Sequence, residues 1–448
     1  MILNCDIHCH SGYSGGVGKI SFDKLYENLK LKGINIYGSA DVLHPLWRES
    51  LKEALIEKEE GFFILKNYQN FIKNNNIINY QKDNANKFYS VRDENFLNKE
   101  FIPRIVLQTE IVLTAPYYFD IKKRKIAHII VLFPSFKVAE ECAKILDKFG
   151  VKLSIGRPFI KFETISQLED FFENLVIRYP DIEIIPAHIF TPDGVLGGEN
   201  PIESLEQFFG SFTYKIHALE SGLSADPDMI LSIENLNKYA VISNSDAHSE
   251  ALNRIGREFF AIELSDMGYH NFISAIREKK IVYSVEFKPE HGRYYLTGHR
   301  EDRHINNRAI FYNYEDVPQD FICPICHKKM VQGVEYRVNL LLQKNKNLKN
   351  LRRQKFYYSI PLMDIISSIK VYSVKSIKIK QIYAKIIDKI GFESNLYMID
   401  EKEFIKRIEN IDIDDRVKKA LYSIKKEKFK FDPPGFDGHY GKLIVDLS

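Results

Sequence analysis

The sequence DIHCH at residues 6–10 is the most informative segment, because it places two histidines directly after the first apolar run. On a β-strand, side chains two residues apart point to the same side, so His8 and His10 can reach one metal ion together. Much later in the chain, SNSDAH at residues 243–248 repeats this arrangement with an aspartate and a histidine. Either pair alone is weak evidence, since core or surface histidines are the more frequent explanation.

Outward from DIHCH, the first 280 residues or so alternate short apolar runs with amphipathic segments. Such alternation predicts a mostly parallel sheet, open or closed into a barrel. The predicted strands cover residues 3–7, 34–38, 105–108, 127–133, 182–186, 216–219, 240–243 and 259–263. The predicted helices include residues 22–31, 137–149, 165–178 and 269–279.

Other metal-ligating residue types stand at the ends of these strands or within an apolar run. They are Asp41, His44, Glu110, His128, His188 and Glu220. A buried acid or histidine is costly unless it is paired or bound to metal. In barrel-like α/β folds, catalytic groups collect at the carboxyl ends of strands, and mixtures of imidazole and carboxylate suit Zn, Mn or Fe. The spacing therefore predicts a multi-metal hydrolase.

Composition excludes several classes of protein. The chain has 448 residues, enough for two or three domains, and 63 basic against 60 acidic residues give a net charge of +3. This balance excludes a globally polycationic DNA-coating protein. Five cysteines exclude a disulfide scaffold. The absence of a long apolar stretch predicts no membrane span, and the N-terminus does not resemble a signal peptide, so we expect a cytoplasmic protein.

The remaining sequence divides into an insertion and two later segments. Residues 73–100 are rich in Asn and Lys and read as a surface insertion in a domain that spans residues 1–285. Residues 286–342 carry several His and Arg and the pair Cys323 and Cys326. Residues 343–448 are helical in pattern, and basic residues far outnumber acids between residues 344 and 385. This excess favours DNA binding over a merely solvated lysine face.

The order of these motifs resembles the PHP (polymerase and histidinol phosphatase) superfamily. Longer segments resemble endonuclease Q and its bacterial relatives: GRP (156–158), PAHIFTP (186–192), LESGLSAD (219–226), SNSDAHS (243–249) and NRIGREF (253–259). Later segments fit as well: YLTGHR, CPICHKKM with GVEYRV, IPLMDII and PPGFDGHYGK. The resemblance covers nearly the whole chain except the Asn-rich insertion.

This resemblance implies a PHP-type distorted (β/α)7 barrel, then a small zinc-binding module and a helical, basic C-terminal domain. It also implies two or three metal ions, with Glu110 bridging two of them and with Glu110, Asp246 and His248 in catalytic roles. By position, the ligands would be His8, His10, Asp41, Glu110, His128, His188, Asp246 and His248. His44 could instead shape the rim, and Glu220 could instead anchor a backbone turn. Zn2+ is the expected metal, with Mg2+ or Mn2+ as ions that could support activity.

The second expected metal site is a structural zinc ion held by Cys323 and Cys326. Two further ligands are needed, and His299 and His304 lie upstream. Relatives usually carry a cysteine near or after GHR; this chain has none there, so His304 takes its place. His327 completes a CxxCH, the spelling of a c-type haem site, which we reject because no export signal is present.

The implied activity is hydrolysis of DNA on the 5′ side of uracil, hypoxanthine, xanthine and abasic sites. Damaged DNA is the expected partner, and replication or repair proteins are further candidates. The alternatives are a PHP phosphatase that acts on a small phosphomonoester and a non-catalytic DNA-binding protein. Candidate DNA contacts are the cations Arg157, Arg254, Arg257, Arg352 and Arg353, together with Phe190 as a wall of a base pocket. Alternatively, each arginine pairs with a structural acid, and Phe190 packs within a loop.

Overall fold

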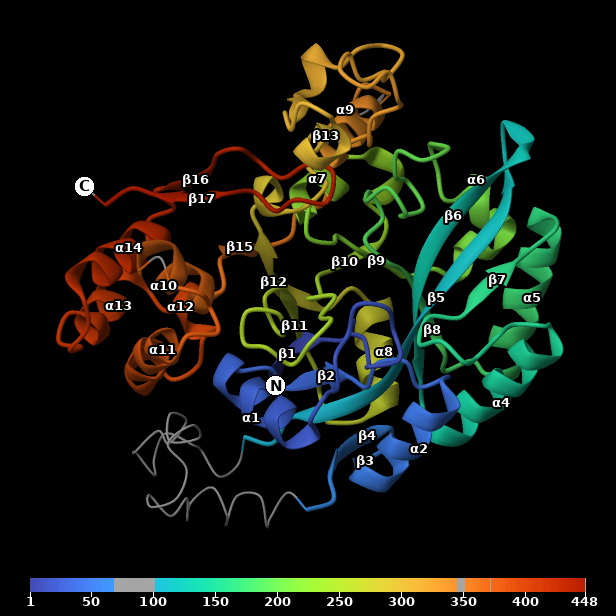
Figure 1. The fold of residues 1–448 in the computed structure, drawn as a ribbon. Helices are drawn as coiled ribbons and strands as arrows, with labels where there is room; N and C mark the ends of the chain where they lie inside the picture. Colours follow the sequence, from blue (N-terminus) through green and yellow to red (C-terminus); the bar gives the residue numbers. More distant parts are fainter. Residues whose placement is uncertain (68–100, 345–350, 371, 448) are drawn as a thin grey trace.

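The computed structural model describes residues 1–67, 101–344, 351–370 and 372–447 (Figure 1). The predicted insertion at residues 73–100 lies outside the described residues. No helix among them is long and apolar enough to cross a membrane.

A sheet of 11 strands forms the centre of the protein (Figure 1). Its strands are β1 (Ile2–Asp6), β2 (Ile36–Gly38), β3 (Leu55–Glu59), β4 (Phe62–Leu65), β5 (Arg104–Tyr117), β6 (Asp120–Phe133), β7 (Phe159–Lys161), β8 (Glu183–Pro186), β11 (Phe259–Glu263), β12 (Ile281–Phe287) and β15 (Phe356–Ser359). The main path runs β15-β12-β11-β1-β2-β5-β4-β3, while β6 and β7 pair with β5 and β8 pairs with β6. A separate parallel pair consists of β9 (Ala218–Glu220) and β10 (Ala240–Ile242).

The prediction of a mostly parallel sheet is wrong, because the described sheet is mixed. Strand β1 pairs parallel with β2 and β2 with β5, but β1–β11, β11–β12, β5–β6 and β6–β8 are antiparallel. The largest departure is the β5–β6 hairpin, whose 14-residue strands were predicted as two short separate strands. A short turn joins them directly, and such a turn permits only antiparallel pairing. Closure into a barrel stays a prediction.

The helices cover the sheet and confirm the four predicted ones to within about two residues. They are α1 (Phe22–Lys32), α2 (Pro45–Ala54), α4 (Phe136–Lys148), α5 (Ile165–Arg178), α6 (Glu206–Phe209), α7 (Pro227–Leu231) and α8 (Tyr269–Arg277). The side chains of Ser21, Ser135 and Thr164 cap α1, α4 and α5 by accepting a bond from an amide of the first turn. Alternate residues of β5 enter different apolar clusters, so the sheet is buried on both faces.

The chain after β12 returns to the main sheet. Strand β12 spans the predicted boundary at residue 285, and β15 pairs with it in parallel. Between them lie β13 (Thr297–His299), β14 (Ile310–Tyr312) and α9 (Val334–Leu342). After β15 come α10 (Leu362–Lys370), α11 (Ile377–Ile390), α12 (Asn395–Met398), α13 (Glu401–Ile408), α14 (Asp415–Lys425), β16 (Phe429–Phe431) and β17 (Leu443–Val445). Short 3₁₀ turns cover Gly210–Lys215, Glu234–Leu236, Pro289–His291, Glu301–Arg303 and Tyr314–Asp316.

Candidate metal centre

The two histidine-containing motifs lie side by side in the fold. After β1, the segment that carries His8 and His10 runs next to residues 246–248, and Cys9 forms a parallel bridge with Ala247. The amide of His10 donates to the carbonyl of Ala247 at 2.9 Å. Asp6 fixes the junction, since its carboxylate accepts from the amides of Ser245 and Gly256. The sheet thus brings the first and the last motif to one place.

One group of possible ligands consists of His8, His10 and Asp246, each of which offers an atom within 4.8 Å of the others. The Oδ1 atom of Asp246 lies 3.1 Å from Nε2 of His10 and 3.8 Å from Nε2 of His8. Both histidines are buried, so their facing nitrogens are shielded from solvent.

A second group consists of Glu110, His128 and His188. Oε1 of Glu110 lies 2.7 Å from Nδ1 of His128 and 3.3 Å from Nε2 of His188. Its other oxygen, Oε2, faces the first group and lies 3.4 Å from Nε2 of His10. Glu110 therefore lies between the two groups and contacts residues of both.

The donor atoms of these groups fit a cation. Nε2 of His8, Nε2 of His10, Oε2 of Glu110 and Oδ1 of Asp246 are buried and have no hydrogen-bond partner among the described residues. Buried polar atoms are rarely left unsatisfied, because desolvation costs roughly 1–3 kcal/mol each. Four such atoms that converge from imidazoles and carboxylates match the ligand preference of Zn, Mn or Fe.

A surrounding set of polar side chains holds the histidines in place. Nδ1 of His8 lies 3.0 Å from Oε1 of Glu220, whose other oxygen accepts from the amide of His188 at 2.8 Å. Nδ1 of His188 contacts the hydroxyl of Thr191 at 2.8 Å. A metal-ligating histidine usually makes such a contact through its second nitrogen, which fixes the ring and the tautomer. Glu220, which the sequence left uncertain, therefore has a positioning role.

The electrostatics of the cluster are those of a cation site. Burial lowers the pKa of the imidazole of His8, but the carboxylates of Glu220, Asp246 and Glu110 outweigh it and raise the pKa to about 9. For Glu110, burial raises the pKa, but His128 and its neighbours hold it well below its ordinary value. Protons thus balance the carboxylates in the metal-free protein, and a bound metal must displace them.

Replacement of Glu220 by glutamine is expected to weaken metal binding or activity by about 10–100-fold, as for other residues that orient a ligand. The change removes the negative charge behind His8 but keeps the shape of the side chain. Competition with a chromophoric chelator measures the metal affinity. The matched change Glu263→Gln, at an exposed position of β11, should have no effect. Equal affinities for both variants would contradict the positioning role.

Three predicted or possible ligands lie at the margin of the two groups. Asp41 sits behind His10, with Oδ1 3.5 Å from Nδ1, and its Oδ2 accepts from Ser11 and Ser14. The ring of His248 packs against that of His10 at 4.4 Å, and its Nδ1 lies 3.0 Å from the carbonyl oxygen of Asp246. His44 caps α2 and stacks on Tyr13 at the rim.

A cleft of about 710 Å³ opens onto both groups. Four arginines line it, from three separate segments of the chain: Arg157, Arg254, Arg257 and Arg293. Arg157 reaches the centre itself, since Nη1 lies 3.5 Å from Oε2 of Glu110. A polar cleft with several guanidinium groups beside a cluster of metal-ligand residues suits a phosphate-bearing substrate.

The four side chains of the second predicted metal site also come together. His299, His304, Cys323 and Cys326 offer donor atoms within 4.8 Å of one another. Nε2 of His304 lies 3.1 Å from Sγ of Cys323, and Nδ1 of His299 lies 3.4 Å from Sγ of Cys326. The second nitrogen of each histidine contacts a backbone carbonyl oxygen, of Lys329 or Arg308, so one nitrogen of each ring faces the thiols. His327 is exposed and outside this group.

The change Cys323→Ser is expected to remove one equivalent of bound zinc and to unfold the segment around residues 297–331 locally. Structural zinc sites contribute folding free energy directly, and four ligands are needed to close the tetrahedral shell. Elemental analysis of the purified protein and hydrogen exchange of this segment measure the two effects. A Cys142→Ser variant, which changes a buried thiol of α4, serves as the control. Unchanged zinc content in Cys323→Ser would contradict the assignment.

Comparison with solved structures covers the whole chain. The lesion-specific endonuclease PfuEndoQ from Pyrococcus furiosus matches with a TM-score of 0.74 and 25% identity, over 99% of this chain and 96% of that one. Endonuclease Q in complex with a 27-mer duplex that bears an abasic lesion at the active site matches with a TM-score of 0.77 and 25% identity, over 100% and 97%. Over its whole length, the chain is similar to these endonuclease Q structures.

The other comparisons are more limited. No family model matches the chain. An uncharacterized protein of Methanocaldococcus jannaschii is 29% identical over 253 residues, which are 54% of this chain and 30% of that protein. The chain spans less than a third of the length of the curated relatives it matches.

The structure corrects two candidate DNA contacts. Phe190 is fully buried in the apolar core, whereas the next residue, Thr191, lines the cleft. Arg352 donates from Nη2 to the carbonyl oxygen of Tyr239, and its amide donates to Asn237, so it joins two segments of the fold. Arg353 is exposed, and Arg254 and Arg257 line the cleft.

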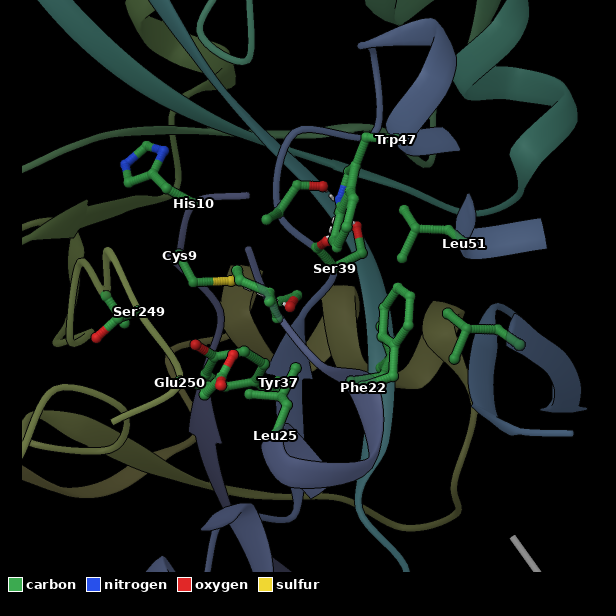
Figure 2. A pocket seen from close by; sticks show the side chains of 16 residues that line it. Cys9, His10, Phe22, Leu25, Tyr37, Ser39, Trp47, Leu51, Ser249 and Glu250 are labelled. Atoms are coloured by element: carbon green, nitrogen blue, oxygen red, sulfur yellow. Dashed lines mark hydrogen bonds between the residues drawn. The ribbon is translucent and has the colours of Figure 1, made fainter. Parts of the chain in front are cut away.

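Cys9 points away from the metal centre, as the sequence predicts. Figure 2 shows its thiol directed into an apolar pocket walled by Phe22, Trp47 and Leu51, while His10 lies on the other side. The cavity there is about 20 Å³, which is room for one water molecule and far too little for a nucleobase. Trp47 is buried and stacks on Phe22 at 5.2 Å, so it belongs to the core.

Arg293 and Tyr440 are among the cleft-lining residues that the sequence did not predict. Arg293 follows β12, in a segment where no motif marked it. Tyr440 lies in the motif PPGFDGHYGK, whose residues by themselves indicate no chemistry for it. The only available signal was an aromatic residue among glycines near the end of the chain.

Proposed function

We propose that the protein is a metal-dependent endonuclease that hydrolyses DNA at damaged nucleotides. The observation that carries the proposal is a cleft in which arginines surround two groups of metal-ligand residues joined by Glu110. The full-length match to lesion-specific endonucleases supports the same activity. A small phosphomonoester would not require a cleft of about 710 Å³ lined by four arginines.

The proposed roles follow from the geometry. His8, His10 and Asp246 would hold one metal ion, and Glu110, His128 and His188 a second, with Asp41 and His248 beside them. The bound ions, which we expect to be zinc with magnesium or manganese as substitutes, would activate water and stabilise charge on the phosphoryl oxygens. Arg157, whose Nη1 lies 3.5 Å from Oε2 of Glu110, would orient the phosphate that is cleaved by charge-assisted hydrogen bonds. The neutral ring of His248 would offer a nitrogen that accepts a proton at the edge of the cleft.

The proposed substrates are DNA duplexes with uracil, hypoxanthine, xanthine or an abasic site, cut on the 5′ side of the lesion. The abasic duplex in the similar complex supports this class. Lesions weaken base pairing, so extrusion of the damaged nucleotide into a cleft costs less than for a normal one. A zinc ion in the Cys/His group and DNA contacts from residues 343–448 belong to the same proposal, and a cytoplasmic location stays a prediction.

The test is a nicking assay with end-labelled duplexes that carry one abasic site, one uracil, one hypoxanthine or no lesion. Each is incubated with Zn2+, Mg2+ or Mn2+ and the products are sized on a denaturing gel. We expect a single nick on the 5′ side of the lesion and none in the intact duplex. The Asp246→Asn variant keeps the side-chain shape but loses a charged ligand, so it should not cut. Hydrolysis of small phosphomonoesters, or binding without cleavage, would replace the proposal by one of its alternatives.

A further inference from the structure

Three arginines of the cleft converge on one tyrosine from the far end of the chain. Nη1 of Arg257 donates to the hydroxyl of Tyr440 at 2.8 Å, and Nη1 of Arg254 donates to it at 3.4 Å. The guanidinium carbon of Arg293 lies 5.8 Å from the centre of the same ring. The four residues come from three segments that meet only in the tertiary structure, and all four line the cleft of the metal centre.

The arginines of this cluster contact a phenol at close range instead of a carboxylate. Among the described residues, no carboxylate lies within 4 Å of the guanidinium groups of Arg254, Arg257 or Arg293, whereas Arg48, Arg104, Arg277 and Arg407 each have such a partner. The group at the centre is a phenol rather than a carboxylate. Burial alone would raise the pKa of Tyr440, but the charges of Arg257 and Arg254 hold it below its ordinary value. An excess of guanidinium groups in a cleft is the usual signature of an anion site.

The hydrogen bonds of Tyr440 leave one donor for a ligand. A phenol has one O–H donor and two acceptor positions. The two arginines use the oxygen as an acceptor, so the proton of the hydroxyl remains available to an anionic oxygen in the cleft. Arg257 is 4% exposed and its Nε donates to the carbonyl of Ser245 at 2.8 Å, one residue before Asp246. The cluster is therefore fixed directly beside the metal-ligand residues.

The loop that carries Tyr440 is held rigidly. The amides of Gly435 and Gly441 donate to the carbonyls of Glu290 and His291, and that of Gly438 donates to Arg293. A Cβ atom at Gly435 would lie 1.8 Å from a backbone oxygen, so only glycine fits there. The ring of His291 stacks between Phe287 at 4.1 Å and Phe431 at 4.6 Å. This packing positions the phenol before any substrate arrives.

We propose that Tyr440, with Arg254, Arg257 and Arg293, forms an anion site that holds a phosphodiester group of the DNA strand next to the one that is cleaved. The inference rests on the proposed function, which it deepens by naming the residues outside the metal centre that hold the strand. Tyr440 acts as a positioning residue: it keeps two guanidinium groups in one orientation and donates one hydrogen bond to the phosphate.

The test compares Tyr440→Phe and Arg293→Met with the wild-type protein on the abasic duplex. Loss of a hydrogen bond to a charged group should raise KM by about tenfold in Tyr440→Phe, with a smaller fall in kcat. Arg293→Met should lower the slope of log Kd against log salt by about one, as for the loss of one phosphate contact. Metal content should stay unchanged in both variants. The control is Tyr214→Phe, at a tyrosine that is 65% exposed on another surface.

A second arm distinguishes DNA from free phosphate. Inorganic phosphate should compete with the duplex in the wild-type protein and compete less well in Tyr440→Phe. Inhibition by phosphate without any change of KM for DNA in the variants would mean that the site serves free phosphate, and would overturn the proposal. A loss of kcat with KM unchanged would also overturn it, because the residue would then act on the reaction itself.

Failure of the proposed function can be separated from failure of the anion site. Nicking by the wild-type protein tests the proposed function. The ratio of the DNA affinities of the variant and the wild-type protein tests the anion site. Fluorescence anisotropy of a labelled abasic duplex in the Asp246→Asn background gives this ratio without cleavage. Equal binding and equal salt dependence with and without the Tyr440→Phe change would overturn the anion site, whatever the nicking assay shows.

Discussion

Replacing Glu110 with glutamine is expected to lower lesion-dependent nicking by about a thousandfold or more. This carboxylate contacts both groups of metal-ligand residues, with Oε1 toward His128 and His188 and Oε2 toward His10. Glutamine has the same shape but lacks the charge, and its amide nitrogen cannot bind a metal ion. Metal ions contribute several kcal/mol to the stabilisation of charge in phosphoryl transfer, and about 4 kcal/mol corresponds to a thousandfold in rate.

Two measurements show that the effect arises from the metal centre. Elemental analysis should find at least one metal ion less in Glu110→Gln, while the zinc expected in the Cys/His group remains. Circular dichroism and binding to the abasic duplex should change little, since Glu110 lies on the rigid β5–β6 hairpin. Glu57→Gln, a change at an exposed position of β3, is the matched control. Full nicking activity in Glu110→Gln would exclude a bridging role for this residue.

The second large effect concerns stability. Glu393→Ala is expected to lower the free energy of unfolding by about 3–5 kcal/mol, the usual consequence of breaking a buried ion pair. Glu393 is fully buried and accepts from Nζ of Lys32 at 2.6 Å, from the hydroxyl of Tyr383 at 2.9 Å and from the amide of Leu362 at 3.1 Å. Its loss leaves the buried ammonium of Lys32 without its carboxylate.

This ion pair joins two parts of the fold, because Lys32 ends α1 and Glu393 precedes α12 (Figure 1). Urea denaturation measures the loss of stability, and limited proteolysis shows whether the helices after β15 open first. The matched control is Glu403→Ala, which breaks an exposed pair with Arg407 and should cost less than about 1 kcal/mol. Similar losses of stability in both variants would show that the buried pair does not stabilise the contact between α1 and the helices after β15.

The net charge of the surface formed by residues 344–385 cannot be judged from that stretch of sequence alone. Between residues 344 and 385 the sequence shows many basic residues and a single acid, Asp364. In the fold, several of these lysines contact acids from elsewhere: Lys344 meets Glu203, Lys370 meets Asp414 and Lys385 meets Asp412. The exposed excess of positive charge is thus smaller than the sequence implies, since tertiary structure supplies counter-charges from distant segments.

The sequence by itself determined which residues carry the chemistry and where the principal helices lie. Spacing of two along a strand places His8 with His10 on one side, and apolar periodicity locates α1, α4, α5 and α8, because both signals are local properties of the backbone. The Cys/His group was predictable for a similar reason, because its residues stand near one another in segments that resemble a known family.

Only the tertiary structure decided which atoms of these residues face one another. It turned Oε2 of Glu110 toward His10, placed Glu220 behind His8, buried Phe190 and brought Tyr440 beside Arg257. These contacts join segments that are hundreds of residues apart or depend on which side of a turn is buried. Local spacing contains no information about such choices, because they are set by the packing of the whole sheet and its helices.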